Sequence, residues 1–103
     1  MASPAQLRDL RDRIDSVDAS LIQLLAERFS LTEQVGRIKA ESRLPAQDAE
    51  RERAQQARYA SLAATNHLRV DVALRVMGTI VELVKDRHAQ IAAPKGHGAG
   101  IAP

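Results

Sequence analysis

Cysteine is absent from this chain, and Phe29 and Tyr59 are its only aromatic residues. Without cysteine, the chain has neither a disulfide framework nor a thiol nucleophile. Its three histidines lie in neighbourhoods poor in carboxylates, so we expect no metal site. Because aromatic residues are scarce and β-branched residues are scattered, the apolar 45% of the chain is expected to form helices and no strands.

The chain also lacks a long apolar run and a block of like charge. No segment approaches the roughly 20 apolar residues of a membrane span, and residues 1–4 are too short and uncharged to start a signal peptide. We therefore expect a cytoplasmic protein with no membrane contact. The 15 Lys and Arg residues are interleaved with 13 Asp and Glu residues, so the net charge of +2 does not call for a nucleic-acid partner.

Apolar side chains recur every three or four residues through about the first forty positions, which is the spacing of one helix face. This stripe consists of Leu7, Leu10, Ile14, Val17, Leu21, Leu24, Leu31, Val35 and Ile38. At the start, Ser3 and Gln6 are placed to form a capping box around Pro4. At the other end, Pro45 pushes the residue before it out of the helical region. We predict one long helix from residue 4 to just before Pro45, with Arg28 as the one break in its stripe.

Two shorter helices are predicted after Pro45. The first covers about residues 48–63 and is expected to face solvent. Its weak apolar face consists of Ala54, Ala57 and Leu62. Residues 65–67 form a break, and a third helix over about residues 70–92 repeats a core pattern that includes His88. In the long helix, Gly36 is expected to allow a close approach of another element.

These elements predict one helical domain over residues 1–92 and a flexible tail over residues 93–103. A helix of about forty residues is about 55 Å long, whereas a compact chain of this size has a radius of gyration of about 13 Å. The chain therefore cannot cover its own first helix. We expect an all-α fold with three helices per chain, paired with a second copy in an intertwined six-helix homodimer.

Arg28 marks a candidate site, because a cation set into an apolar helix face must meet an anion or lie exposed. Lys39 lies three turns later and faces the same way within about 20°, so both side chains can line one pocket. Arg11 lies about 25 Å before Arg28 along the helix axis and cannot reach the same small ligand. In an antiparallel dimer, however, Arg11 of the partner subunit can complete the pocket across the interface.

Further candidate residues share helix faces by their spacing of three and four. They are Asp48, Arg51 and Glu52 on the second helix, and Val84 and His88 on the third. These candidate residues include several cations and few carboxylates, and they contain no nucleophile, metal-ligand set or phosphate-binding loop. This combination suggests a small ligand that bears carboxylates and a hydroxyl. These residues alone do not exclude a ligand that bears a phosphate.

The run from Arg11 to Arg53 resembles the all-helical class of chorismate mutases, and in length the small monofunctional type. The shared pattern consists of Arg11, Leu24-Leu25-Ala26-Glu27-Arg28, Val35-Gly36, Lys39, Pro45 and Asp48-x-x-Arg51-Glu52-Arg53. The resemblance implies conversion of chorismate to prephenate in phenylalanine and tyrosine biosynthesis, with no cofactor and no covalent intermediate. It also implies that Arg28 and Arg11 of the partner subunit grip the substrate carboxylates, with Arg51 organising that end.

By the same resemblance, Lys39 donates to the ether oxygen, while Glu52 and the backbone near Asp48 hold the substrate hydroxyl. Two residues depart from the family pattern: Val84 stands where a small hydroxyl residue is usual, and His88 stands where a glutamine is usual. A histidine replaces that glutamine as a donor only with a proton on the nitrogen that faces the substrate. We therefore expect activity to increase as the pH falls into the range where histidine is protonated.

Other activities fit the same residues. Isochorismate pyruvate lyase and aminodeoxychorismate mutase act on related substrates, although the intact Asp48-x-x-Arg51-Glu52 pattern favours the chorismate mutase. A non-enzymatic alternative is a helical dimerisation or regulatory module, in which Arg28 and Lys39 only add polarity to the interface. The flexible tail suggests docking to another enzyme of the shikimate pathway. No fused dehydratase or dehydrogenase fits in 103 residues, so a monofunctional enzyme is expected.

Overall fold

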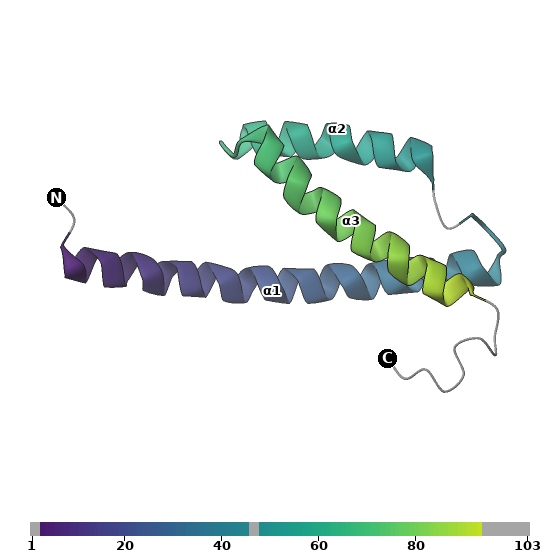
Figure 1. Ribbon diagram of the computed structural model, residues 1–103, viewed down its shortest axis with the longest axis horizontal. Helices are drawn as coiled ribbons and strands as arrows, with labels where there is room; N and C mark the ends of the chain where they lie inside the picture. Colours follow the sequence, from purple (N-terminus) through teal and green to yellow (C-terminus); the bar gives the residue numbers. More distant parts are fainter. Residues whose placement is uncertain (1–2, 46–47, 94–103) are drawn as a thin grey trace. The chain divides into compact units, whose positions relative to one another are not determined.

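The computed structural model describes residues 3–45 and 48–93. Within these residues it contains three helices and no strand (Figure 1): α1 (Pro4–Glu41), α2 (Ala49–Thr65) and α3 (Val70–Ala92). The predicted all-α class and the three predicted helices are confirmed. Residues 94–103 of the predicted tail lie outside the described part of the chain. The chain divides into two units, residues 1–32 and residues 33–103, so that α1 contributes to both.

Helix α1 begins with the predicted capping box. The backbone N–H of Ser3 donates to Oε1 of Gln6 over 2.6 Å, and the backbone N–H of Gln6 donates to Oγ of Ser3 over 3.1 Å. These two bonds satisfy donors at the helix start that have no partner within the helix. The predicted start of the helix at Pro4 is therefore confirmed together with its cause.

Helices α1 and α2 end in the same way, with a residue in the left-handed backbone region. Arg43 has φ 55° and His67 has φ 56°. After α1, the N–H of Leu44 donates to the carbonyl of Lys39 over 2.8 Å; after α2, the N–H of Leu68 donates to the carbonyl of Ala63 over 2.9 Å. This six-to-one bond is the Schellman arrangement, usually made with glycine at the left-handed position. It ends α1 at Glu41, ahead of the proline that predicted the stop.

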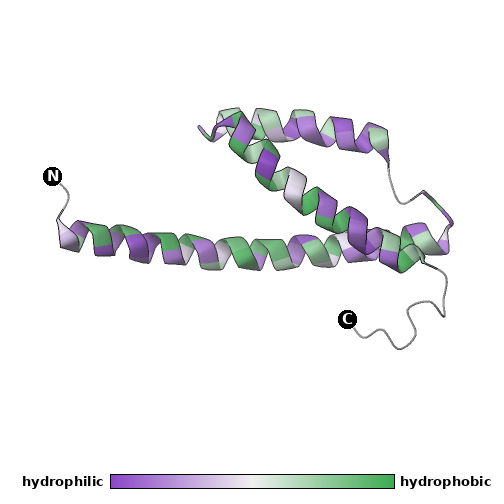
Figure 2. Ribbon diagram, viewed as in Figure 1, coloured by the Kyte–Doolittle hydropathy of each residue, from purple (hydrophilic) through white to green (hydrophobic). Residues whose placement is uncertain are grey.

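The first unit contains the N-terminal part of α1, whose apolar stripe is exposed. Every residue from 3 to 24 is exposed, and the exposed fraction reaches 65% at Val17 and 62% at Leu24. Apolar and polar residues alternate along the helix in Figure 2, as the predicted spacing requires. This half of α1 therefore presents a long apolar face.

In the second unit, α2 and α3 are in contact, and the chain reverses direction between them, so that they lie closest near the turn that joins them (Figure 1). Ala63 of α2 and Ala73 of α3 are 3% and 8% exposed. The inner face of α2 differs from the predicted one, because Ala54, Ala57 and Leu62 are all exposed. The residues of α2 that are partly or fully buried are Glu52, Gln55, Tyr59, Ala60 and Ala63. Polar side chains are turned toward α3, so a prediction based on apolar residues alone missed this face.

The last turns of α1 pack against the end of α3. Gly36 is the buried residue of α1, and His88 is one of two buried residues of α3. An ideal Cβ atom built on Gly36 would lie 2.9 Å from Cδ1 of Ile91, which leaves no room for a larger residue. The close approach predicted at Gly36 and the core position predicted for His88 are both confirmed. Within the described ranges, no helix has a stretch long and apolar enough to cross a membrane.

Candidate active site

Lys39 and Asp48 line one pocket of about 360 Å³. Lys39 lies in the last turn of α1, where it is partly buried, and Asp48 immediately precedes α2. The other lining residues are Leu44 and Pro45, which follow α1, and Ala49, which is the first residue of α2. The end of α1 and the start of α2 therefore contribute to one pocket two residues that the sequence analysis assigned to one site.

Asp48 has a structural role in the same place, because it caps α2. Its backbone is extended (φ −133°, ψ 95°), and its Oδ1 atom accepts a hydrogen bond from the backbone N–H of Arg51 over 3.0 Å. An N-cap of this kind contributes typically about 1 kcal/mol to helix stability. Arg51 lies in the first turn of α2 with an exposed side chain. The predicted functions of these two residues are compatible with this geometry.

Glu52 lies one turn into α2, partly buried, and its carboxylate is paired with a lysine of α3. Nζ of Lys85 lies 3.0 Å from Oε1 of Glu52 and 3.4 Å from Oε1 of Glu82. The hydrogen bond to Glu52, with a smaller contribution from Glu82, raises the pKa of Lys85 above its ordinary value. Glu52 and Lys85 line a pocket of about 90 Å³ between the two helices, together with Gln55, Gln56, Tyr59, Leu74, Gly78, Val81 and Glu82.

Sequence reasoning missed Lys85. Its spacing of three from Glu82 was visible as a local ion pair, but its pairing with Glu52 joins residues of two different helices. The sequence signal that could have pointed to Lys85 is its position between Val84 and His88, which are both candidate site residues. Lys85 therefore enters the candidate site only through the packing of α2 against α3.

His88 lies deep in the contact between α1 and α3. The residue is 6% exposed, and its ring lies against Gly36, where an ideal Cβ atom would be 2.7 Å from Cδ2 and 3.0 Å from Nε2. Val84 lies one turn before His88 on α3 and is partly buried. The predicted shared face of these two residues is therefore turned inward.

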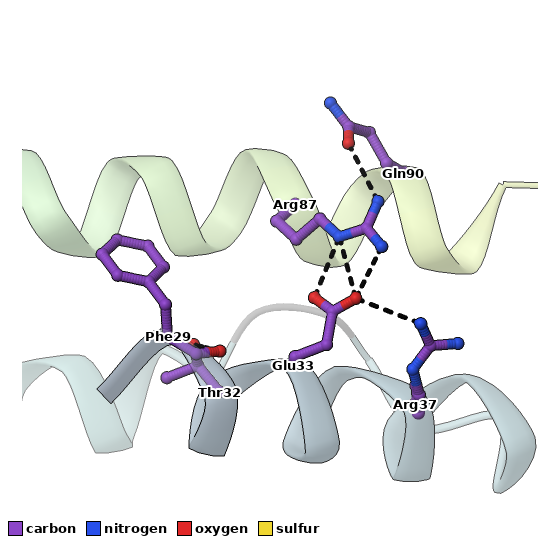
Figure 3. Close-up of polar contacts among 6 residues, drawn as sticks. All are labelled: Phe29, Thr32, Glu33, Arg37, Arg87 and Gln90. Atoms are coloured by element: carbon purple, nitrogen blue, oxygen red, sulfur yellow. Dashed lines mark hydrogen bonds and ion pairs between the residues drawn. The ribbon is translucent and has the colours of Figure 1, made fainter. Parts of the chain in front are cut away.

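An ion-pair network beside His88 joins the same two helices (Figure 3). Nε of Arg87 lies 2.9 and 3.1 Å from the two carboxylate oxygens of Glu33, and Arg37 approaches Oε1 of Glu33 at 3.2 Å. The guanidinium of Arg87 also donates to Oε1 of Gln90 over 3.3 Å. The hydrogen bond from Arg87 lowers the pKa of Glu33, and the charges of Arg37 and His88 act in the same direction with smaller effect. This network holds the last turns of α1 to the end of α3.

Two predicted site residues belong to the first unit. Arg11 is exposed, and Arg28 is partly buried. Their convergence with Lys39, Asp48 and Glu52 stays a prediction. Across the residues that the structure describes, no group of three or more His, Cys, Asp or Glu side chains is arranged to hold a metal ion.

The class of protein follows from these observations. It is a helical protein with a candidate site for a small charged ligand, because a lysine and an aspartate line one pocket and further charged residues lie on the adjoining helices. The sequence model of the chorismate mutase type II family matches residues 10–89. The chain therefore belongs to the chorismate mutase type II family, and the resemblance noted in the sequence is confirmed at the level of the family.

Several known proteins are similar to this chain, and two of the three described here are named as chorismate mutases. The chorismate mutase of Methanocaldococcus jannaschii is 29% identical over 77 residues, which are 75% of this chain and 78% of that protein. A bifunctional chorismate mutase/prephenate dehydratase of Escherichia coli is 37% identical over 82 residues, which are 80% of this chain. The T-protein of Haemophilus influenzae is 53% identical over 46 residues, or 45% of this chain. The chain spans only 21% and 12% of the lengths of the last two proteins.

Proposed function

We propose that this chain catalyses the rearrangement of chorismate to prephenate. The observation that carries the proposal is the shared pocket of Lys39 and Asp48, in a chain that belongs to the chorismate mutase type II family. The reaction breaks a C–O bond and forms a C–C bond within one molecule, so it requires orientation and charge stabilisation and no nucleophile. A positioned lysine and a small number of polar groups supply this chemistry without a cofactor.

In this proposal Lys39 is the central catalytic residue. Negative charge grows on the ether oxygen as the C–O bond breaks, and an ammonium group aimed at that oxygen stabilises the transition state more than the substrate. His88 is the second donor to the same oxygen. Its burial against Gly36 limits the orientations that its ring can adopt, which is consistent with a hydrogen-bond donor directed at a single acceptor.

The remaining residues bind the substrate. Arg28 and Arg11 of the partner subunit hold the two carboxylates in the chair conformation that the reaction needs, and Arg51 organises that end. Glu52 and the backbone at Asp48 hold the hydroxyl, and Val84 contributes apolar contact. The position of Asp48 at the start of α2 supports this assignment, because the first N–H groups of a helix are available to bind a ligand.

We further propose that the active form is an intertwined homodimer. The support is the exposed apolar stripe of α1, from Leu7 to Leu24, which is far longer than the scattered apolar residues normal for a monomer surface. Pairing two such helices lengthwise buries both stripes and carries Arg11 to the other subunit's site. Docking to another enzyme of the shikimate pathway and a cytoplasmic location stay predictions from the sequence.

Steady-state loss of chorismate, with the product identified by chromatography, tests the proposed activity. We expect prephenate from the parent, a decrease in kcat of about 10²- to 10³-fold for Lys39→Ala, and near-parent activity for the control Arg58→Ala, which removes an exposed cation of α2. Turnover of isochorismate or aminodeoxychorismate in place of chorismate would overturn the proposed substrate. No turnover of any of the three would favour a dimerisation or regulatory module.

A further inference from the structure

The proposed function assigns the substrate hydroxyl to Glu52, and the structure pairs the carboxylate of Glu52 with Lys85. The two members of this ion pair come from different helices, α2 and α3, and their closest atoms are 3.0 Å apart. Both side chains are partly buried, with exposed fractions of 32% for Glu52 and 25% for Lys85. Partial burial reduces the solvent screening that weakens ion pairs on an open surface.

The pair changes the net charge at this end of the site. Alone, an ionised Glu52 would present a full negative charge to a ligand. With the Lys85 ammonium on its Oε1 atom, the pair is neutral overall, and its Oε2 atom still has the capacity to accept a hydrogen bond. Glu82 also contacts Lys85, but its side chain is 69% exposed, so solvent screens its charge. The cation of Lys85 is therefore part of the lining of the pocket between α2 and α3.

A neutral ion pair distinguishes between two kinds of polar group on a substrate. A hydroxyl carries no charge, and it needs only one acceptor, which Glu52 supplies. An ammonium group prefers a carboxylate that is not already neutralised, and it is repelled by a second cation beside that carboxylate. Chorismate carries a hydroxyl, whereas aminodeoxychorismate carries an amine, and both have the same carboxylates and enolpyruvyl ether.

We propose that Lys85 is a specificity-determining residue, which favours a substrate with a hydroxyl over one with an amine by pairing with Glu52. This inference rests on the proposed function, because it assumes that Glu52 faces the substrate. Lys85 acts here through the charge and orientation of Glu52 and is not itself placed on the reacting atoms. The discrimination is expected in the relative kcat/KM of the two substrates and not in the chemistry of the C–O bond.

The test compares kcat/KM for chorismate and aminodeoxychorismate at pH 7 in four proteins. Lys85→Met keeps the length of the side chain and removes its charge, and Lys85→Arg restores a cation. The control Arg69→Met removes one positive charge from an exposed ion pair with Asp71 at the start of α3. We expect Lys85→Met to shift the ratio toward the amine by about tenfold, equivalent to about 1.4 kcal/mol, and the other two variants to shift it by less than about twofold.

The outcomes separate this inference from the proposed function. A parent that converts chorismate, with a Lys85→Met ratio equal to its own, would overturn the inference and leave the activity intact. An equal loss on both substrates would assign Lys85 a structural role only, and would overturn it as well. A parent that converts neither compound would overturn both proposals. Circular dichroism establishes that each variant is folded, and Lys85→Gln is a second neutral variant if methionine disturbs the packing.

Discussion

Gly36 and His88 touch across the contact between α1 and α3, and the contact has no room for a Cβ atom at position 36. An ideal Cβ atom there would lie 2.7 Å from Cδ2 of His88. Glycine inside a helix costs about 1 kcal/mol relative to alanine, so it is unfavourable for α1 taken alone. The packing of α3 offsets that cost by placing the imidazole of His88 in the groove that glycine leaves.

Replacement of Gly36 by alanine is expected to reduce stability despite the better helix propensity of alanine. Overpacking in a filled contact costs about 1–3 kcal/mol, which exceeds the gain of about 1 kcal/mol from propensity. The matched control is Gly78→Ala in α3, where an ideal Cβ atom meets nothing within 4 Å. We expect the control to gain about 0.5–1 kcal/mol. Urea unfolding at equal protein concentration measures both, and equal gains for the two variants would contradict the close contact.

The pair of Glu33 and Arg87 is expected to make stability depend on acid pH. Arg87 lowers the pKa of Glu33 in the folded chain. The stabilisation is therefore fully present above the ordinary glutamate pKa of about 4.3 and is lost as the pH falls through the lower folded pKa. Glu33→Gln should lower Tm at pH 7 and have little effect at pH 2–3. Asp71→Asn, which breaks the exposed pair with Arg69, is the control. A Glu33→Gln effect of equal size at both pH values would argue against the ion pair.

His88 is expected to make catalysis depend on pH near neutrality. If the protonated imidazole is the second donor to the ether oxygen, kcat should increase by about three- to tenfold as the pH decreases from 8 to 5.5. Glu33 is the carboxylate whose charge interacts with His88 from α1, and its lowered pKa keeps it ionised throughout this range. His88→Gln should remove the dependence, because glutamine donates at every pH. A flat profile in the parent, equal to that of His88→Gln, would reject the role of His88.

Complementation between two inactive variants tests whether Arg11 acts across the dimer. Arg11→Ala and Lys39→Ala are each expected to be nearly inactive as homodimers. When the two are unfolded and refolded together, a mixed dimer contains one site with both substitutions and one with neither, if Arg11 comes from the partner. Random pairing then restores about a quarter of the parent activity. No recovery would show that Arg11 and Lys39 serve the same site from one chain.

The sequence by itself determined the helices, because their ends depend on residues close in the chain. Ser3 and Gln6 cap α1 by hydrogen bonds over three residues, as their spacing predicts, and Asp48 caps α2 by a bond over the same separation. The inward position of His88 also followed from its spacing in an apolar pattern. These are local or periodic properties, which one helix expresses whatever packs against it.

Only the tertiary structure decided which side chains meet across helices. Glu33 and Arg87 are 54 residues apart in sequence, and Glu52 finds Lys85 on a different helix. The inner face of α2, which contains Glu52 and Tyr59 and excludes Leu62, was likewise mispredicted from apolar residues. The physical reason is that a cross-helix pair depends on the rotation and offset of two helices. A close contact such as that of Gly36 with His88 sets these quantities, and no local pattern encodes them.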